Sequence, residues 1–264
     1  MKAARRDEER EAGEKAATGT SGTTARDRGQ RRAVVFVLAA AAFGWFFWPR
    51  TASLRRFDPE AMASLEARMW RSYYEHRRLA LVADLYAMSR DQYGFSPWDS
   101  LRLAKYAGSA ALAFQTTTNR LEAGQAIPAL ERYFGLMATR SAEPFDPHKA
   151  AREELDWWQS RREGQSWEEY APAVARVTAT VYGMAAAEAL PAARVRCEMM
   201  ARRDARRNRP LDDSDWAEIR AGLVGAWREL KERVRKRQGT RRWLSEGKPR
   251  RHRGWRRRRH SHSS

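Results

Sequence analysis

The chain has 264 residues, and its 51 lysines and arginines against 33 aspartates and glutamates give a formal net charge of +18. Apolar side chains make up 42% of the residues, which is enough for a hydrophobic core and excludes a chain that is disordered throughout. The single cysteine excludes an intrachain disulfide and is compatible with either side of a membrane.

The positive charge is spread unevenly along the chain. Residues 239–264 hold ten lysines and arginines and one acid, whereas residues 1–32 hold nine against six acids. About half of the excess therefore lies in the C-terminal segment, and the net charge does not indicate a basic face on a folded domain. We predict that both segments are disordered, charged tails. The heavy use of arginine and alanine is what we expect of a GC-rich bacterial genome.

A stretch without any charged side chain follows the N-terminal tail. Residues 33–48 read AVVFVLAAAAFGWFFW, and Pro49 ends the stretch. A helix of this length rises about 24 Å, and flanking arginines can cover the gap to a hydrocarbon core of about 30 Å. Because the stretch is apolar on every face, we predict a transmembrane anchor over residues 33–49. A buried core helix and a cleaved signal peptide are the alternatives, and the bulky end of the stretch disfavours cleavage.

The arginines that flank this stretch predict its orientation. Four closely precede it and three follow it: Arg26, Arg28, Arg31 and Arg32, then Arg50, Arg55 and Arg56. Basic residues favour the cytoplasmic side, so we expect the N-terminus inside and the domain outside the cell membrane. The arginine-rich C-terminus argues for the opposite orientation.

Residues 58–238 predict an all-α bundle of about seven helices behind this single transmembrane helix. The first helix covers residues 60–90, where apolar side chains recur every three or four positions. The second covers residues 97–116, and its small, mostly uncharged residues predict a place at the centre of the bundle, with a second membrane span as the alternative. The remaining helices are predicted at residues 127–140, 147–162, 173–183, 191–207 and 213–239.

Capping residues mark several of these helix ends. Asp58 and Asp146 each precede a proline, while Ser96 and Ser166 each stand three residues before an acid, as in a capping box. We expect Pro172 to separate a short turn from the fifth helix. Gly183 is expected to end that helix in the left-handed conformation.

The first predicted helix carries polar side chains on or beside its apolar stripe. Glu66 and Tyr73 are seven positions apart and share a face, and Tyr73 and His76 are three apart and can touch. The three residues are therefore a possible buried polar cluster. A hydrogen-bond network that only orders the core, with His76 exposed, is the alternative.

The sequence supplies no recognisable catalytic, cofactor or metal site. A helical di-metal site needs Glu-x-x-His pairs, and the chain has none. Glu153, Glu154 and Asp156 could supply oxygen ligands, but they fit the solvated side of a helix equally well. Nearby arginines would activate Cys197 as a nucleophile, whereas its neighbouring methionines indicate an apolar filler. We expect no cofactor and lean against an enzyme.

The C-terminal tail has the most distinct physical property of the chain. Seven arginines surround one tryptophan there, and such a segment binds nucleic acid or anionic lipid without reading a sequence. The residues of this possible polyanion-binding segment are Arg250, Arg251, Arg253, Trp255, Arg256, Arg257, Arg258 and Arg259.

These patterns favour a membrane-anchored helical domain that acts as a protein-interaction or structural module. The abundance of tryptophan and tyrosine is consistent with anchors for a partner protein. Polyanion binding through the tail is the first alternative. A membrane-bound enzyme with an unrecognised site is the second.

Overall fold

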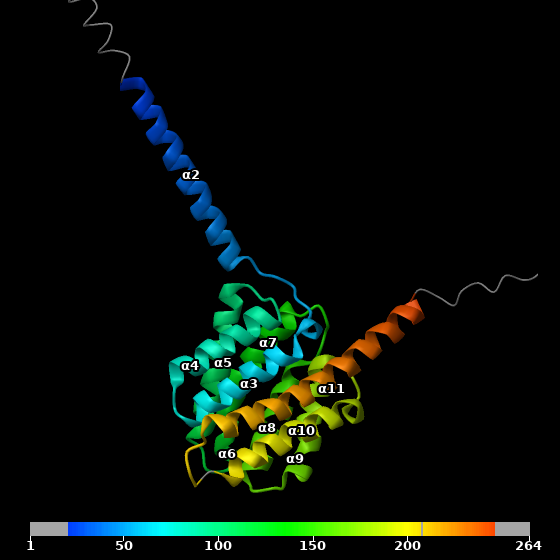
Figure 1. The fold of residues 1–264 in the computed structure, drawn as a ribbon. Coiled ribbons are helices and arrows are strands. Elements are labelled where there is room, and N and C mark those ends of the chain that lie inside the picture. Colours follow the sequence, from blue (N-terminus) through cyan, green and yellow to red (C-terminus); the bar gives the residue numbers. More distant parts are fainter. Residues whose placement is uncertain (1–20, 207, 246–264) are drawn as a thin grey trace, which may run out of the picture.

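The computed structural model describes residues 21–206 and 208–245, and it confirms an all-α protein with a helical bundle. Most of the long helix α2 (Ser21–Phe47) projects away from the bundle (Figure 1). The C-terminal end of the last helix, α11, projects from the bundle at a different place. The helices of the bundle are α3 (Pro59–Tyr74), α4 (Arg78–Ala87), α5 (Pro97–Gln115), α6 (Arg120–Ala123), α7 (Ile127–Arg140), α8 (Pro147–Arg162), α9 (Trp167–Tyr182), α10 (Ala186–Ala205) and α11 (Asp213–Ser245). Short helical turns occur at Leu54–Arg56, Met88–Gln92 and Gly124–Ala126. The described part of the chain contains no β-strand.

Helix α2 contains the predicted apolar anchor. Within the described residues, Gln30–Phe47 is the one helical stretch that is long and apolar enough to cross a membrane, and none of its residues is buried. The helix begins at Ser21, so residues 21–32 are helical, although we predicted them as part of a disordered tail. Extending an existing helix costs far less than nucleating one, which explains how the apolar segment continues into polar sequence.

The end of α2 packs against the first turn of α5. The ring of Phe47 lies 5.4 Å from that of Trp98, measured between centroids. The guanidinium groups of Arg50 and Arg90 lie 5.5 and 5.3 Å from the ring of Trp45. Cation–π contacts of this kind add to the apolar packing, so α2 meets the bundle directly.

A second contact ties the chain to the bundle soon after α2. Ala52 donates its N–H to the carbonyl of Arg140 over 2.8 Å, and its own carbonyl accepts the N–H of Ala142 over 2.8 Å. Glu143 accepts hydrogen bonds from the Ser53 hydroxyl at 2.6 Å and from a backbone N–H at 3.1 Å. The link between anchor and bundle is therefore only residues 48–51.

Most of the predicted helix starts are confirmed by their caps. Asp58 accepts the N–H of Ala61 at 2.8 Å, and Asp146 accepts two backbone N–H groups at 3.0 Å. Glu169 accepts the N–H of Ser166 at 2.7 Å, which is the carboxylate half of a capping box. Gly183 ends α9 with φ 63°, as the left-handed cap requires.

The capping box predicted at the start of α5 forms only in part. The hydroxyl of Ser96 accepts the N–H of Asp99 at 3.2 Å. The carboxylate of Asp99 instead pairs with Arg140 at 2.7 Å and with Arg102 at 3.3 Å. A nearly buried carboxylate gains more from two guanidinium partners than from one backbone N–H, so the ion pairs determine its orientation.

The long helix predicted over residues 60–90 is wrong, because the chain reverses at His76. This residue has φ 56°, and α3 and α4 pack against each other on either side of it. The turn is held by the N–H of Arg77, which donates to the carbonyl of Ser72 over 2.8 Å. Arg68 and Asp84 then form an ion pair of 2.9 Å between the two helices. The apolar period continues through the break, and it therefore gave no signal of the reversal.

Two prolines lie inside helices, contrary to our predictions. We expected Pro172 to separate a turn from a helix and Pro191 to be the first residue of one. Pro172 lies within α9 and Pro191 within α10. Both lie in the second turn of their helix, and the carbonyls that lose an N–H there belong to the exposed residues Glu168 and Ala187, where water can replace it. Helix α10 begins earlier than predicted because Glu188 accepts the N–H of Ala185 at 2.8 Å.

The predicted position of α5 and the predicted end of α11 are also wrong. Helix α5 lies at the surface of the bundle, with Leu101 and Leu112 exposed by 42% and 39%. Helix α11 passes Gly239 and reaches Ser245. A single glycine lowers helix stability by about 1 kcal/mol without ending the helix.

The core lies around α9. This helix packs between α8 and α10, and α11 packs across α3 and α10 (Figure 1). Ala171 and Val174 of α9 and Ile219 and Leu223 of α11 are fully buried. The helices α4, α5 and α7 complete the bundle on the opposite side, and a large space remains between the two groups of helices.

Candidate functional site

A cavity of about 840 Å³ lies within the bundle. Its wall is built by α3, α4, α5, α7, α8, α9, α10 and α11, and six of the chain's eight tyrosines line it. Protein interiors are normally packed as densely as organic crystals, so a space of this size is exceptional. Its volume falls within the range of about 300–1,000 Å³ that is typical of ligand pockets.

A buried ion pair forms one side of the cavity. Glu66 of α3 is 0% exposed, and its carboxylate accepts the Nε–H of Arg196 from α10 at 2.5 Å. The other carboxylate oxygen accepts the indole N–H of Trp227 from α11 at 2.7 Å. Three helices are therefore joined at a single carboxylate, and all three residues line the cavity.

Arg196 is only partly satisfied by this pair. Burial by itself would lower the pKa of its guanidinium, but the charges of Glu66 and Glu154 raise the pKa above its usual value. Among the described residues, neither terminal nitrogen of Arg196 has a hydrogen-bond partner. A quarter of the side chain (25%) remains accessible because it faces the cavity. Arg196 thus presents unused N–H donors to this space.

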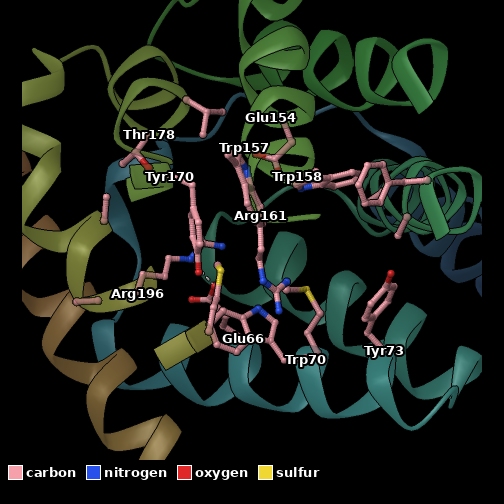
Figure 2. A pocket seen from close by; sticks show the side chains of 18 of the residues that line it. Glu66, Trp70, Tyr73, Glu154, Trp157, Trp158, Arg161, Tyr170, Thr178 and Arg196 are labelled. Carbon is pink, nitrogen blue, oxygen red and sulfur yellow. Dashed lines mark hydrogen bonds and ion pairs between the residues drawn. The ribbon is translucent and has the colours of Figure 1, made fainter. Parts of the chain in front are cut away.

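Glu154 faces the same space from α8. Figure 2 shows Glu154 on one side of the cavity, with Glu66 and Arg196 on the other. Its carboxyl group accepts the indole N–H of Trp158, one turn further along α8, at 2.9 Å. Burial raises the pKa of Glu154, because a charged carboxylate is poorly solvated here. The nearby charge of Arg196 opposes this effect only in part.

Tyrosine hydroxyls add further polar atoms near Arg196. The hydroxyls of Tyr93 and Tyr182 are 3.1 Å apart and share a hydrogen bond. Among the described residues, the hydroxyl of Tyr133 has no hydrogen-bond partner. Burial raises the pKa of all three phenols, so they remain neutral donors and acceptors at ordinary pH. The inner part of the cavity is therefore aromatic, with donor groups at a few positions.

A second polar group lies where α3, α8 and α10 end. Arg161 forms a bidentate pair with Asp204, from Nε at 3.0 Å and from Nη2 at 2.8 Å, and donates to the hydroxyl of Tyr74 at 2.5 Å. Arg203 stacks on the ring of Tyr74, with its guanidinium carbon 3.3 Å from the ring centroid, and also contacts Asp204 at 3.2 Å. These residues form a network across the ends of three helices.

Arg162 extends this network to the end of α5. Its guanidinium lies over the ring of Phe114 at 3.4 Å and donates to the carbonyl of Phe114 and to the hydroxyl of Thr117, both at 2.5 Å. The C-terminal end of a helix carries about half a negative charge, so gathered helix ends stabilise gathered arginines. This side of the cavity is consequently closer to neutral than a count of arginines suggests.

The structure brings together two of the three residues that we predicted as a buried polar cluster. Glu66 and the half-buried Tyr73 both line the cavity, although no hydrogen bond joins them. His76 lies outside the cavity and is exposed in the turn between α3 and α4. The contact predicted between Tyr73 and His76 required an unbroken helix, and the break at His76 removes it.

Cys197 is buried under the cavity wall. It is 0% exposed, and burial raises the pKa of its thiol to about 12, so the reactive thiolate is scarce. Tyr170 packs beside it and donates to its backbone carbonyl at 3.2 Å. Of the arginines near it in the sequence, Arg196 pairs with Glu66 and Arg203 contacts Asp204. These contacts favour the interpretation as an apolar filler.

Other predicted sites lie apart from the cavity or outside the described residues. In residues 21–206 and 208–245, no group of three or more His, Cys, Asp or Glu side chains is arranged to hold a metal ion. The arginine-rich segment predicted to bind polyanions, residues 250–259, lies outside the part that the structure describes.

Sequence analysis missed the residues that define the site, Arg196 and Glu154. We considered Arg196 only as a neighbour of Cys197, and Glu154 only as a solvated or metal-binding acid. One signal was available in α8, where Glu154 and Trp158 are four apart and therefore share a face with Trp157 beside them.

Fold and site together define a class of protein: an all-α domain with a large aromatic cavity, preceded by an apolar helix that could cross a membrane. The comparison of the chain with protein-family models, with curated proteins and with solved structures finds no match. The functional argument therefore depends on the geometry of the cavity.

Proposed function

We propose that this chain is a membrane-anchored binding domain whose central cavity takes an apolar or aromatic small molecule. The single observation that carries the proposal is a space of about 840 Å³ lined largely by aromatic and other apolar side chains. Such a space stabilises the fold far less than a packed core would, and a ligand that fills it restores the lost contacts. A ligand-binding domain explains the cavity better than the protein-interaction module that the composition favours.

The location that accompanies this proposal is the membrane, with α2 as a single span. Its support is the apolar stretch Gln30–Phe47, in which no residue is buried and which contacts the bundle only at its C-terminal end. The flanking arginines favour an orientation with the N-terminus on the cytoplasmic side of the membrane and the bundle on the outside. Binding of anionic lipid or nucleic acid by the C-terminal tail stays a prediction.

The cavity proposal is tested by filling the cavity. Ala193 on α10 lines the cavity and is 3% exposed, whereas Ala187 on the same helix is exposed. In the full chain, reconstituted in lipid nanodiscs, we expect A193F to weaken the binding of a naphthyl methyl ketone by about tenfold or more, because the added ring occupies the same space. A187F should bind the ketone as the unchanged chain does.

Binding is measured by calorimetry, with empty nanodiscs subtracted, and circular dichroism checks that each variant is folded. If A193F does not fold, Ala111→Phe from the opposite wall replaces it. Ketone binding that is absent, or that is the same in the cavity-filling variant and in A187F, would overturn the proposal.

A further inference from the structure

Two polar side chains of the inner cavity carry hydrogen-bond donors that have no partner among the described residues. Arg196 offers the N–H groups of both terminal nitrogens, and Tyr133 offers its hydroxyl. Glu154 joins them when it carries a proton, and its raised pKa makes that form more abundant. Such a group of donors calls for an acceptor oxygen from the ligand.

These groups line one cavity. Arg196, Glu154, Tyr133 and Tyr182 all belong to its wall, and they come from α10, α8, α7 and α9. Figure 2 shows Arg196 and Glu154 reaching into that space from α10 and α8. The hydroxyl of Tyr182 is already hydrogen-bonded to that of Tyr93. Arg196, Glu154 and Tyr133 are therefore the groups left for a ligand.

The charge of Arg196 is already balanced. Glu66 is fully buried and paired with it at 2.5 Å, so the two together are neutral. A carboxylate or phosphate ligand at Arg196 would bring a negative charge beside Glu66, whereas the other arginines of the wall, Arg161, Arg162 and Arg203, make their contacts in the second polar group, with Asp204, Thr117 and Phe114. A neutral carbonyl accepts the same hydrogen bonds without bringing that charge.

We propose that Arg196 recognises the carbonyl oxygen of an uncharged, apolar ligand in the cavity. This inference rests on the proposed function and adds the chemical class of the ligand to it. Glu66 acts as a positioning residue, because it holds the Nε side of the guanidinium and leaves the terminal nitrogens directed at the ligand. Trp227 in turn fixes Glu66 through its indole N–H.

Three matched probes test the ligand class on the full chain in nanodiscs: ethylnaphthalene without an acceptor, the naphthyl methyl ketone, and naphthoate. We expect the ketone to bind about tenfold or more tightly than ethylnaphthalene, since a hydrogen bond to a charged donor is worth about one to two factors of ten. Naphthoate should bind more weakly than the ketone. Tighter binding of naphthoate, or equal binding of ethylnaphthalene, would contradict the inference.

The variant R196K tests the residue. Lysine keeps a positive charge for Glu66 but loses the planar fork of donors, so the preference for the ketone over ethylnaphthalene should largely disappear. The matched control is R194K, on the exposed face of α10. The double variant E66Q and R196Q, which keeps a neutral hydrogen-bonding pair, should show the same loss if R196K does not fold.

The outcomes separate the two proposals. If A193F weakens ketone binding but R196K leaves the ketone preference unchanged, the carbonyl inference fails and the cavity function stands. If none of the probes binds in a way that A193F alters, both fail.

Discussion

The side chain of Glu66 joins three helices. Its two oxygens hold Arg196 of α10 and Trp227 of α11, and its own backbone belongs to α3. A fully buried carboxylate is costly unless every partner is present, so this position tolerates little change. The sequence showed that Glu66 lies on an apolar face but did not show which residues it contacts. Those partners lie more than a hundred positions away along the chain.

Replacing Glu66 by alanine should lower the free energy of unfolding by about 3–5 kcal/mol, because a buried guanidinium and an indole N–H lose their partner. Glu66→Gln keeps an acceptor and should cost less. Glu60 on the same helix pairs with Arg228 at the surface, and Glu60→Ala should cost no more than about 1 kcal/mol. Urea unfolding of the full chain, followed by circular dichroism, measures each value. Equal losses for Glu66→Ala and Glu60→Ala would contradict this account.

The raised pKa of Glu154 predicts how the stability of the fold depends on pH. Its pKa in the folded chain is raised above the ordinary 4.5, so the folded state holds its proton more tightly than the unfolded state. The linkage therefore favours folding at low pH and weakens it as pH rises above 4.5 towards the folded-state pKa. Glu154→Gln keeps the oxygen that accepts from Trp158 and removes the titration.

The difference in Tm between Glu154→Gln and the unchanged chain should consequently grow in favour of the variant as pH increases from about 4.5 to neutrality. Differential scanning calorimetry of both proteins at several pH values measures this difference in Tm directly. Glu168→Gln, at an exposed position in α9, is the control and should show a flat difference. A flat line for Glu154→Gln would show that its carboxyl is solvated.

At the scale of the helices, local signals predicted starts and ends better than they predicted breaks. Asp58 and Asp146 begin helices because their side chains accept free N–H groups within three residues, and α9 begins where Glu169 accepts the N–H of Ser166. The reversal at His76 depends on α3 and α4 packing against each other, which no local pattern encodes. The position of α5 at the surface follows from the same limit, because small residues indicate close packing on one face only.

Helices α10 and α11 make a close contact that predicts opposite effects for two glycines of α11. A Cβ at Gly222 would lie 2.7 Å from Met199 Cγ, whereas a Cβ at Gly225 meets nothing within 4 Å. Gly225→Ala should therefore raise the free energy of unfolding by about 0.5–1 kcal/mol through helix propensity. Gly222→Ala should lower it by about 1–3 kcal/mol, because buried Met199 must move.

Urea unfolding of the two variants tests this contact, and Met199→Ala supplies a further control. In the Met199→Ala background the added methyl at Gly222 has room, so the penalty of Gly222→Ala should be largely removed. Stabilisation by both glycine substitutions in the unchanged background would show that the helices are further apart than described.

At the scale of the whole molecule, the sequence predicted the two-part architecture and not the cavity. An uncharged stretch and an amphipathic period are local properties, so both the apolar helix and the all-α bundle follow from reading along the chain. The cavity arises from the arrangement of eight helices, and each helix by itself shows only an ordinary apolar face. The donors on its wall were therefore interpreted as surface or core residues.

The proposed membrane anchor is tested by placing charge at the middle of α2. Leu38→Arg together with Ala39→Arg should move the chain from the carbonate-resistant membrane fraction to the soluble fraction, because each arginine at the centre of a span costs about 2.5–3.5 kcal/mol. Leu79→Arg, at a residue of the bundle that is 89% exposed, should leave the distribution unchanged. Recovery of the unaltered chain in the soluble fraction without detergent would refute the anchor.

The short link of residues 48–51, fastened by Ala52 to the chain around Ser141, has a consequence for how the cavity would be supplied. A tether of this length holds its two ends at a high effective concentration, so the bundle stays within a few residues' reach of the end of α2. Oily molecules partition from water into bilayers, so a domain of the proposed kind, if α2 spans the membrane, would draw on ligand dissolved in the lipid. Its occupancy would then follow the mole fraction of the ligand in the lipid phase more closely than its aqueous solubility.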